Sequence, residues 1–113
     1  MKIKNYELKG IVDTLFSMSN RTNDIKLRWE LSKLSKPYVE MNTLLQQEIN
    51  KIVAEEGETD EKGNKTLKTD NAHYQELMNC EVEIETALYL SFLAHFNPTM
   101  YELIALEKVI AGD

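Results

Sequence analysis

His73, Cys80 and His95 carry the side chains of this chain that bind soft metals or act as nucleophiles most readily. Their positions differ by 7 and 15 residues, whereas zinc sites use closely spaced pairs of ligands. Cys80 has no second cysteine and lies among acidic residues, so we expect a poor nucleophile. These residues therefore predict neither a metal site nor a catalytic cysteine.

A second candidate for chemistry is the row of glutamates at positions 81, 83 and 85. They alternate with Val82 and Ile84, which predicts a strand with all three carboxylates on one face. Magnesium sites need further converging carboxylates or phosphates. We therefore interpret the row as a solvated face that pairs with lysines. The complementary alternation of Lys2, Ile3 and Lys4 predicts the pairing strand, with each Lys opposite a Glu and Ile3 packed on Val82 and Ile84.

Residues 57–70 form the clearest loop of the chain, rich in turn-forming residues. The segment 60–64 has turn chemistry that allows a short hairpin, and it lacks the regular ligand spacing of a calcium loop. Acidic residues gather at this end of the chain, and we take them as candidate partner-binding residues. They are Glu55, Glu56, Glu58, Asp60 and Glu61. No phosphate-binding glycine loop or nucleophile elbow is present, so we expect no cofactor and no enzyme activity.

Charge is divided unevenly along the chain. Residues 1–36 contain eight basic and four acidic residues, whereas residues 37–113 contain five basic and fifteen acidic residues. A chain that pairs with itself or meets a charged partner can use such a division. The overall charge of −6 opposes nonspecific binding to nucleic acid.

Length and composition indicate one soluble domain over residues 1–113. The mean hydropathy is −0.42 and no long apolar run occurs, so no transmembrane helix is expected. The first residues do not resemble a signal peptide, and a single cysteine excludes an intrachain disulfide. We therefore expect a cytoplasmic protein that binds no membrane.

The first elements are predicted to be a short strand over residues 1–4 and a helix capped by Asn5. A turn over residues 17–23 follows the helix. The apolar stripe of this helix consists of Leu8, Ile11, Val12, Leu15 and Phe16.

A longer helix is predicted from its cap at Asp24. Its apolar positions alternate in steps of four and three, and they are Leu27, Leu31, Leu34, Tyr38, Met41, Leu45 and Ile52, with Glu48 as the one interruption. Pro37 removes a backbone donor, so we expect a kink or break that divides the helix into residues 24–36 and 37–56. The seam, together with Trp29, is either ordinary core or a groove for a partner, including a second copy of this chain.

Two further helices complete the expected chain. Asp70 or Asn71 caps a short helix through about Asn79. Asn97 and Pro98 begin a last helix that Gly112 ends, and residues 87–96 are ambiguous between strand and helix. The fold class is therefore α+β and mostly α. We expect three to four helices, one of them long and kinked at proline, with a minimal two-stranded sheet or hairpin.

The order of these pieces resembles a family of short tailed-bacteriophage proteins from low-GC Gram-positive hosts. The resemblance runs through Lys33-Leu34-Ser35-Lys36-Pro37, the turn at Asp60-Glu61-Lys62-Gly63-Asn64, the strand Glu81–Ile84 and the helix that follows Asn97-Pro98. It implies a phage origin and a mostly helical fold with a small sheet. The family has no established activity, so the resemblance implies no chemistry.

From these observations we expect a phage accessory protein that acts by protein–protein contact in the host cytoplasm. In one version its acidic residues occupy the basic channel of a host nucleic-acid-binding or defence protein and so inhibit it. In the alternative it is an adaptor or chaperone in the assembly of the virion head or tail. A homodimer through the long helix is compatible with both.

Overall fold

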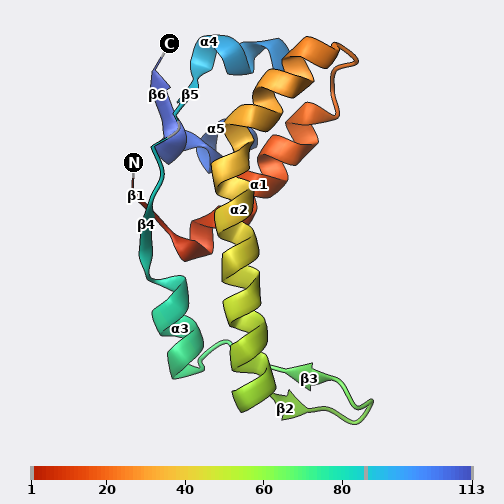
Figure 1. The fold of residues 1–113 in the computed structure, drawn as a ribbon, viewed down its shortest axis with the longest axis vertical. Helices are drawn as coiled ribbons and strands as arrows, with labels where there is room; N and C mark the ends of the chain where they lie inside the picture. Colours follow the sequence, from red (N-terminus) through yellow and green to blue (C-terminus); the bar gives the residue numbers. More distant parts are fainter. Residues whose placement is uncertain (1, 86, 113) are drawn as a thin grey trace.

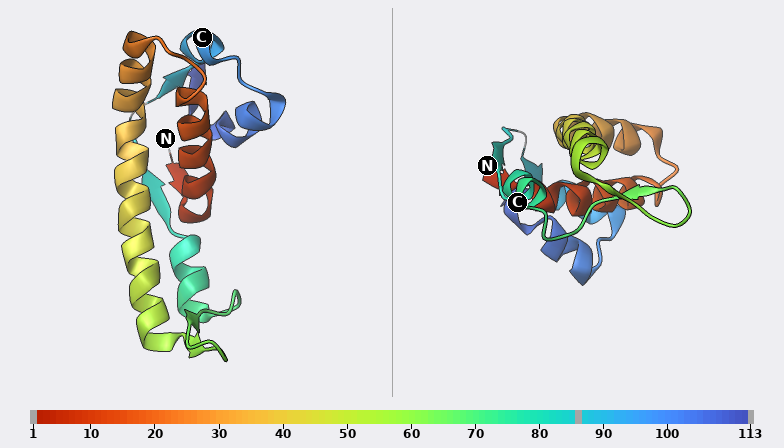
Figure 2. Two further views of the ribbon diagram at one scale, coloured as in Figure 1. Left: turned by 90° about the vertical axis from the view of Figure 1, so that its right-hand side faces the viewer. Right: turned by 90° about the horizontal axis from the view of Figure 1, so that it is seen from below.

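The computed structural model describes residues 2–85 and 87–112. Its architecture is α+β and mostly α, built around one long helix, α2 (Ile25–Glu56). The first helix, α1 (Asn5–Ser19), lies along the upper half of α2, and α3 (Ala72–Met78) lies along its lower half (Figure 1). Figure 2 shows α1 between α2 and the C-terminal elements. The molecule is elongated, with extents of 47 × 29 × 23 Å.

The predicted pairing of the two charged strands is confirmed. Strand β1 (Lys2–Lys4) runs antiparallel to β4 (Glu81–Glu83). The register places Lys2 opposite Glu83, Ile3 opposite Val82 and Lys4 opposite Glu81. Ile3 and Ile84 are both buried, so the alternation of the sequence identified which face meets the core.

The prediction that Asn5 caps the first helix is wrong. The helix is capped at Lys4, whose backbone N–H donates to the Glu7 carboxylate at 3.1 Å. Asn5 is the first helical residue and is buried. Its side-chain amide donates to the Leu77 carbonyl at 2.8 Å, and its backbone N–H donates to the Cys80 carbonyl at 2.9 Å. Asn5 therefore joins α1 to α3, because a buried amide is retained where it finds a partner.

Of the predicted kink or break at Pro37, the break does not occur, because α2 runs through this residue as one helix. Asp24 caps it as expected, with its carboxylate accepting from the backbone of Lys26 and Leu27. The upper turns are inclined to the lower ones, as Figure 1 shows. A proline in a helix removes one hydrogen bond and pushes away the carbonyl four residues earlier, which here belongs to Lys33. Packing on both sides of Pro37 keeps the helix continuous, since Leu31 and Tyr38 are both buried.

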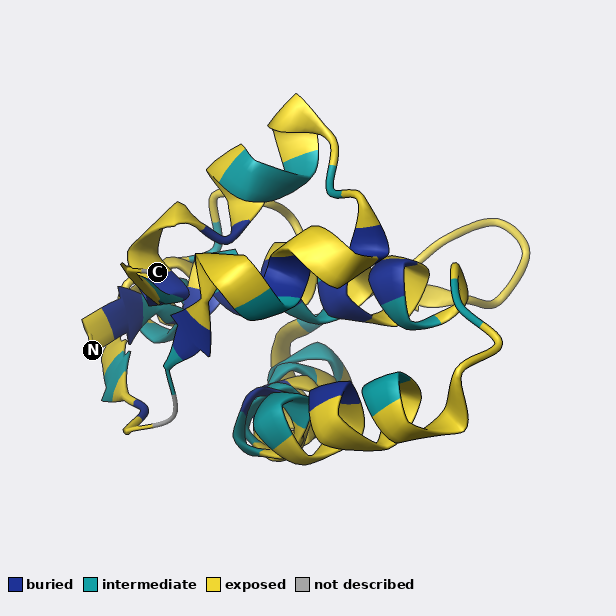
Figure 3. Ribbon diagram, turned by 90° about the horizontal axis from the view of Figure 1, so that it is seen from above, coloured by how far each residue is buried: buried dark blue, intermediate teal, exposed yellow. Residues whose placement is uncertain are grey.

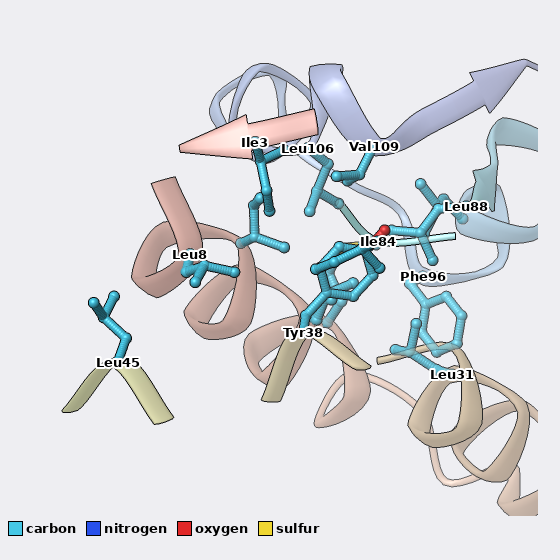
Figure 4. Close-up of a cluster of buried hydrophobic side chains, with 14 residues drawn as sticks. Ile3, Leu8, Leu31, Tyr38, Leu45, Ile84, Leu88, Phe96, Leu106 and Val109 are labelled. Carbon is cyan, nitrogen blue, oxygen red and sulfur yellow. The ribbon is translucent and has the colours of Figure 1, made fainter. Parts of the chain in front are cut away.

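The seam of α2 is core, as one of its two interpretations stated. Its buried positions, Leu31, Tyr38 and Leu45, recur every seven residues. They meet one apolar stripe of α1, and Figure 3 shows that the outer faces of both helices are exposed. Figure 4 shows Tyr38 beside Ile84 in the centre of this cluster. The stripe of α1 consists of Leu8, Ile11, Leu15 and Met18.

The predicted loop contains a hairpin of β2 (Glu58–Thr59) and β3 (Lys65–Thr66). Gly63 has φ +84°, a conformation that favours glycine. Gly57 ends α2 where a Cβ atom would lie 2.4 Å from the Val53 carbonyl oxygen, so a side chain does not fit there. Helix α3 is capped by Asn71, one of the two predicted caps.

The ambiguous segment 87–96 contains both a strand and helical turns, namely β5 (Leu88–Tyr89), α4 (Leu90–Leu93) and the 3-10 turn η1 (Ala94–Phe96). The single last helix that we predicted is replaced by α5 (Met100–Ala105), the 3-10 turn η2 (Glu107–Val109) and β6 (Ile110–Gly112). Thr99 caps α5 with Glu102 in a capping box, in place of Asn97. Gly112 belongs to β6, which pairs in parallel with β5, so it ends no helix. Burial of Leu106 and Val109 directs this change, because both side chains turn into the core.

One ion pair fixes α5 against the turn after α1. Arg21 donates to both carboxylate oxygens of Glu102, at 2.6 and 2.5 Å. The same guanidinium contacts the carbonyl oxygens of Phe96 and Asn97, at 3.3 and 3.2 Å. This contact lowers the pKa of Glu102 and raises that of Arg21. A bidentate guanidinium contact adds direction to the attraction, so it orients the C-terminal segment on α1.

Candidate protein-binding surfaces

An apolar face runs across α1 and the upper half of α2. Phe16 is 69% exposed, Trp29 63% and Ile25 72%, values that are unusual for side chains of this size. Between Phe16 and Val39 lies a groove of about 350 Å³, and Ser32 joins it to a shallower recess at Ile25 and Trp29. We call the surface formed by Phe16, Ile25, Trp29, Ser32, Ser35 and Val39 the α1–α2 face.

Helical geometry explains why these side chains point outward. Leu15 is buried in α1, so the next residue, Phe16, is turned about 100° away from the core. In α2 the seam turns inward at Leu31, which leaves Trp29 on the opposite side. The sequence had placed Phe16 on the inward stripe, and this assignment is wrong. The steps of three and four that include Met18 identify the true stripe.

Small residues form the floor of the groove. The Ser32 hydroxyl donates to the Arg28 carbonyl at 2.8 Å, and the Ser35 hydroxyl donates to the Leu31 carbonyl at 2.7 Å. Because both hydroxyls are satisfied within the helix, an incoming apolar group meets no unpaired donor there. The groove can therefore hold one or two apolar side chains between Phe16 and Val39, with Trp29 beside the adjoining recess.

The predicted acidic residues lie at the opposite end of the molecule, where α2 meets the hairpin. Three of the five make contacts within the chain. Glu58 pairs with Lys68 at 3.5 Å, and the Asp60 carboxylate accepts from the backbone of Lys62 and Asn64, each at 2.9 Å. Lys62, Lys65 and Lys68 lie in the same segment as these acidic residues, which reduces the net negative charge of this end.

Glu56 is the third residue in contact and joins the hairpin end to α3. Its carboxylate lies 2.6 Å from Nδ1 of His73 and accepts from the Asn71 amide at 3.4 Å. The hydrogen bond and charge of Glu56 raise the pKa of His73 above 6.5, and the same bond lowers the pKa of Glu56 below 4.5. Glu55 and Glu61 are exposed. Sequence reasoning had not brought His73 to this end.

The His73–Glu56 contact gives a prediction for pH. A raised histidine pKa means that the contact is lost as pH rises through that pKa, and a lowered glutamate pKa means that it is lost as pH falls through it. We expect the His73 imidazole to titrate above 6.5 in an NMR titration. In Glu56→Gln its midpoint should fall toward the ordinary value. An unchanged midpoint in this variant would contradict the contact.

A third surface lies between α2 and β4. Pro37, Met41, Leu44 and Ile84 line a groove of about 340 Å³ together with the carboxylates of residues 40, 83 and 85. A smaller recess of about 130 Å³ shares Met41 and Leu44 and extends toward Glu48. Leu44 is 55% exposed although it is a large apolar residue. We call this surface the α2–β4 groove.

The residues first considered for metal or nucleophile chemistry have other surroundings. Cys80 is exposed and its thiol donates to the Glu76 carbonyl at 3.3 Å, whereas His95 packs edge-on against Phe92. Among residues 2–85 and 87–112, no three His, Cys, Asp or Glu side chains are grouped closely enough to hold a metal ion. Over the same residues, no helix combines the length and apolar character needed to cross a membrane.

Comparison with known proteins gives no relative. The chain matches no protein-family model, no curated protein sequence and no solved structure.

Proposed function

We propose that this protein acts by binding another protein and not by catalysis, with the α1–α2 face as its main contact surface. The observation that supports this most strongly is the exposure of Phe16 and Trp29 beside a groove with a satisfied floor. Aromatic side chains supply much of the energy of protein interfaces, and exposed apolar patches bordered by polar residues are typical of such sites. On the basis of the resemblance to bacteriophage proteins, we also propose a phage origin and action in the host cytoplasm.

The acidic hairpin end adds a second component to this proposal. Glu55, Glu58 and Glu61 are exposed. They lie at the end of α2 and in the hairpin that follows it, which Figure 1 shows at the opposite end of the molecule from the N-terminal turns of α2. Exposed carboxylates attract a basic partner over a Debye length and raise the rate of encounter. We therefore propose that the partner is a basic host protein, such as one that binds nucleic acid, and that occupying its surface inhibits it.

Assembly of the virion head or tail is the alternative. An adaptor of that kind would use the apolar α1–α2 face without needing the acidic end. The exposed apolar area favours this version as much as the first, so the charge of the hairpin separates the two.

Charge reversal at the hairpin tests the choice. We expect Glu58→Lys with Glu61→Lys to weaken binding to the partner by about fivefold or more at low salt, mainly through slower association. The effect should shrink at high salt because screening shortens the range of the charges. Surface plasmon resonance at two salt concentrations measures both, with the partner identified by affinity purification and mass spectrometry.

The matched control reverses two exposed glutamates outside the hairpin, Glu76 and Glu107. It should leave association nearly unchanged. Equal effects of the two variants would show a response to net charge alone. Binding that is insensitive to both would remove the acidic component and leave the assembly adaptor.

A further inference from the structure

One side of α2 carries charged residues in an order that complements itself in an antiparallel helix pair. When two copies of this helix run in opposite directions, each lysine of the pattern lies opposite a glutamate. We call it the β4-side stripe, because it borders the α2–β4 groove. Its residues follow one another in steps of three or four and so share one face of the helix. They are Lys26, Glu30, Lys33, Pro37, Glu40, Leu44, Glu48, Lys51 and Glu55.

We propose that a second copy of this chain occupies the α2–β4 groove, with the two α2 helices antiparallel. A two-fold axis between residues 40 and 41 then places each stripe residue opposite a complementary one. The resulting pairs, each occurring twice, are Lys26 with Glu55, Glu30 with Lys51, Lys33 with Glu48 and Pro37 with Leu44. Such an interface is isologous, the usual form in homodimers.

Contacts already present within one chain fit this arrangement. Lys33 lies 2.8 Å from Glu30, and Lys51 lies 3.0 Å from Glu48. In the antiparallel dimer, the Glu30–Lys33 pair of one copy lies opposite the Glu48–Lys51 pair of the other, with Glu30 facing Lys51 and Lys33 facing Glu48. Every charge then has an opposite neighbour on its own helix and another on the partner, so four charges form a network instead of an isolated pair.

The centre of the groove supplies the apolar part of the interface. Leu44 of each copy would cover Pro37 of the other, and the neighbouring Met41 and Ile84 form the floor. Glu40 lies beside the axis and would face its own copy. Its carboxylate is 3.8 Å from Lys36, which offsets part of this repulsion.

The shape of the chain supports a large uncovered surface. Its accessible area is 7662 Å², whereas a compact monomer of this mass exposes about 6,400 Å². Its radius of gyration is 16.4 Å, against about 13 Å for a compact domain of this length. An interface of standard size removes about 800 Å² from each partner. The excess area is therefore enough for one such interface.

A pair of charge-reversed variants tests the proposal without requiring either to associate alone. Variant one carries Lys26→Glu and Lys33→Glu; variant two carries Glu48→Lys and Glu55→Lys. In the dimer of either variant, two kinds of pair become like-charged. We therefore expect the self-association of each variant to be weakened by about tenfold or more at low salt. In the mixed dimer every pair is again complementary. Sedimentation velocity of each variant and of the mixture measures this.

The expected result is a concentration-dependent dimer for the natural chain, weaker dimers for each variant, and recovery in the mixture. Recovery also shows that both variants are folded. Glu40→Gln should strengthen the dimer, because it removes one pair of like charges beside the axis, where Glu83 and Glu85 of the same groove add further negative charge. A natural chain that stays monomeric at high concentration overturns the proposal, as does a dimer that neither variant weakens. A mixture that fails to recover overturns the antiparallel pairing.

The dimer uses a different side of α2 from the groove that contains Phe16, and the two surfaces meet where Lys33 lies over the Trp29 ring, 6.0 Å from its centroid. Partner binding is therefore compared in the variant with Glu48→Lys and Glu55→Lys, which leaves Lys33 in place. A monomeric chain that still binds its partner would remove only the dimer. A dimer that binds no partner would remove only the proposed function.

Discussion

Tyr38→Ala is expected to lower the free energy of unfolding by about 3–5 kcal/mol, the range observed when large buried side chains are truncated. Tyr38 is fully buried at the centre of the α1–α2 packing, and it belongs to the same cluster as Leu31 and Ile84 (Figure 4). Urea denaturation followed by circular dichroism measures the change.

Val39→Ala is the matched control for this substitution. It changes the next residue of the same helix, but Val39 is 45% exposed and alanine is the better helix former. We expect a change within about 1 kcal/mol. Similar losses at both positions would show that this turn of α2 does not contribute to the core as described.

Burial also raises the pKa of Tyr38 to about 12. A raised tyrosine pKa favours the neutral form in the folded chain, so stability is lost as pH rises from about 10 toward 12. An ultraviolet titration should therefore show a late tyrosine component that Tyr38→Phe removes. A titration unchanged by this substitution would contradict the burial.

Phe16→Ala combined with Trp29→Ala is expected to weaken partner binding by about 100-fold or more, because aromatic anchors dominate interface energies. Both side chains are more than half exposed, so their removal should leave the stability of the fold nearly unchanged. Isothermal titration calorimetry with the purified partner, together with a thermal melt of each variant, measures both quantities.

The control for this pair lies on α5. Tyr101 is 78% exposed and Ile104 60%, so their replacement by alanine removes a comparable apolar area from a different face. Binding should survive this change. A loss at α5 without a loss at Phe16 and Trp29 would move the binding site from the α1–α2 face to the C-terminal segment.

Local sequence patterns predicted the elements that depend on periodicity. The strict alternation at Lys2–Lys4 and Glu81–Glu83 fixed both the strands and their register, since a slip by one residue would bury charges. The repeating apolar positions of α2 likewise identified its core side through Leu31, Tyr38 and Leu45. These features are visible locally because each residue's face follows from its neighbours.

The elements that were mispredicted depend on distant contacts. Asn5 resembles a cap, but its partner is the Leu77 carbonyl, 72 residues away. Pro37 is compatible with a kink or a break, and packing against α1 keeps α2 continuous, so only the division into two helices is wrong. The C-terminal segment has a helical pattern, and it ends early because Ile110 pairs with Leu88 in a parallel strand. Tertiary packing overrides local propensity in all of these cases.

The candidate sites likewise include one that the sequence indicates and one that only the tertiary structure reveals. Composition drew attention to the acidic residues, and the structure shows that Glu56, Glu58 and Asp60 also serve contacts within the chain. The sequence does not identify Phe16 as a surface residue, because an apolar residue at the edge of a buried stripe fits the helical spacing whether it faces the core or the solvent. Only the position of α2 against α1 shows that the groove beside it stays open.

Site-specific photo-crosslinking tests the central claim most directly. A photoreactive phenylalanine analogue at position 16 samples the α1–α2 face, and the same group in place of Tyr101 samples an exposed position on α5. In cells that contain the partner, we predict a single partner adduct from position 16 and none from position 101. Adducts of equal yield from both positions, or an adduct from position 101 alone, would contradict the assignment of the α1–α2 face as the binding surface.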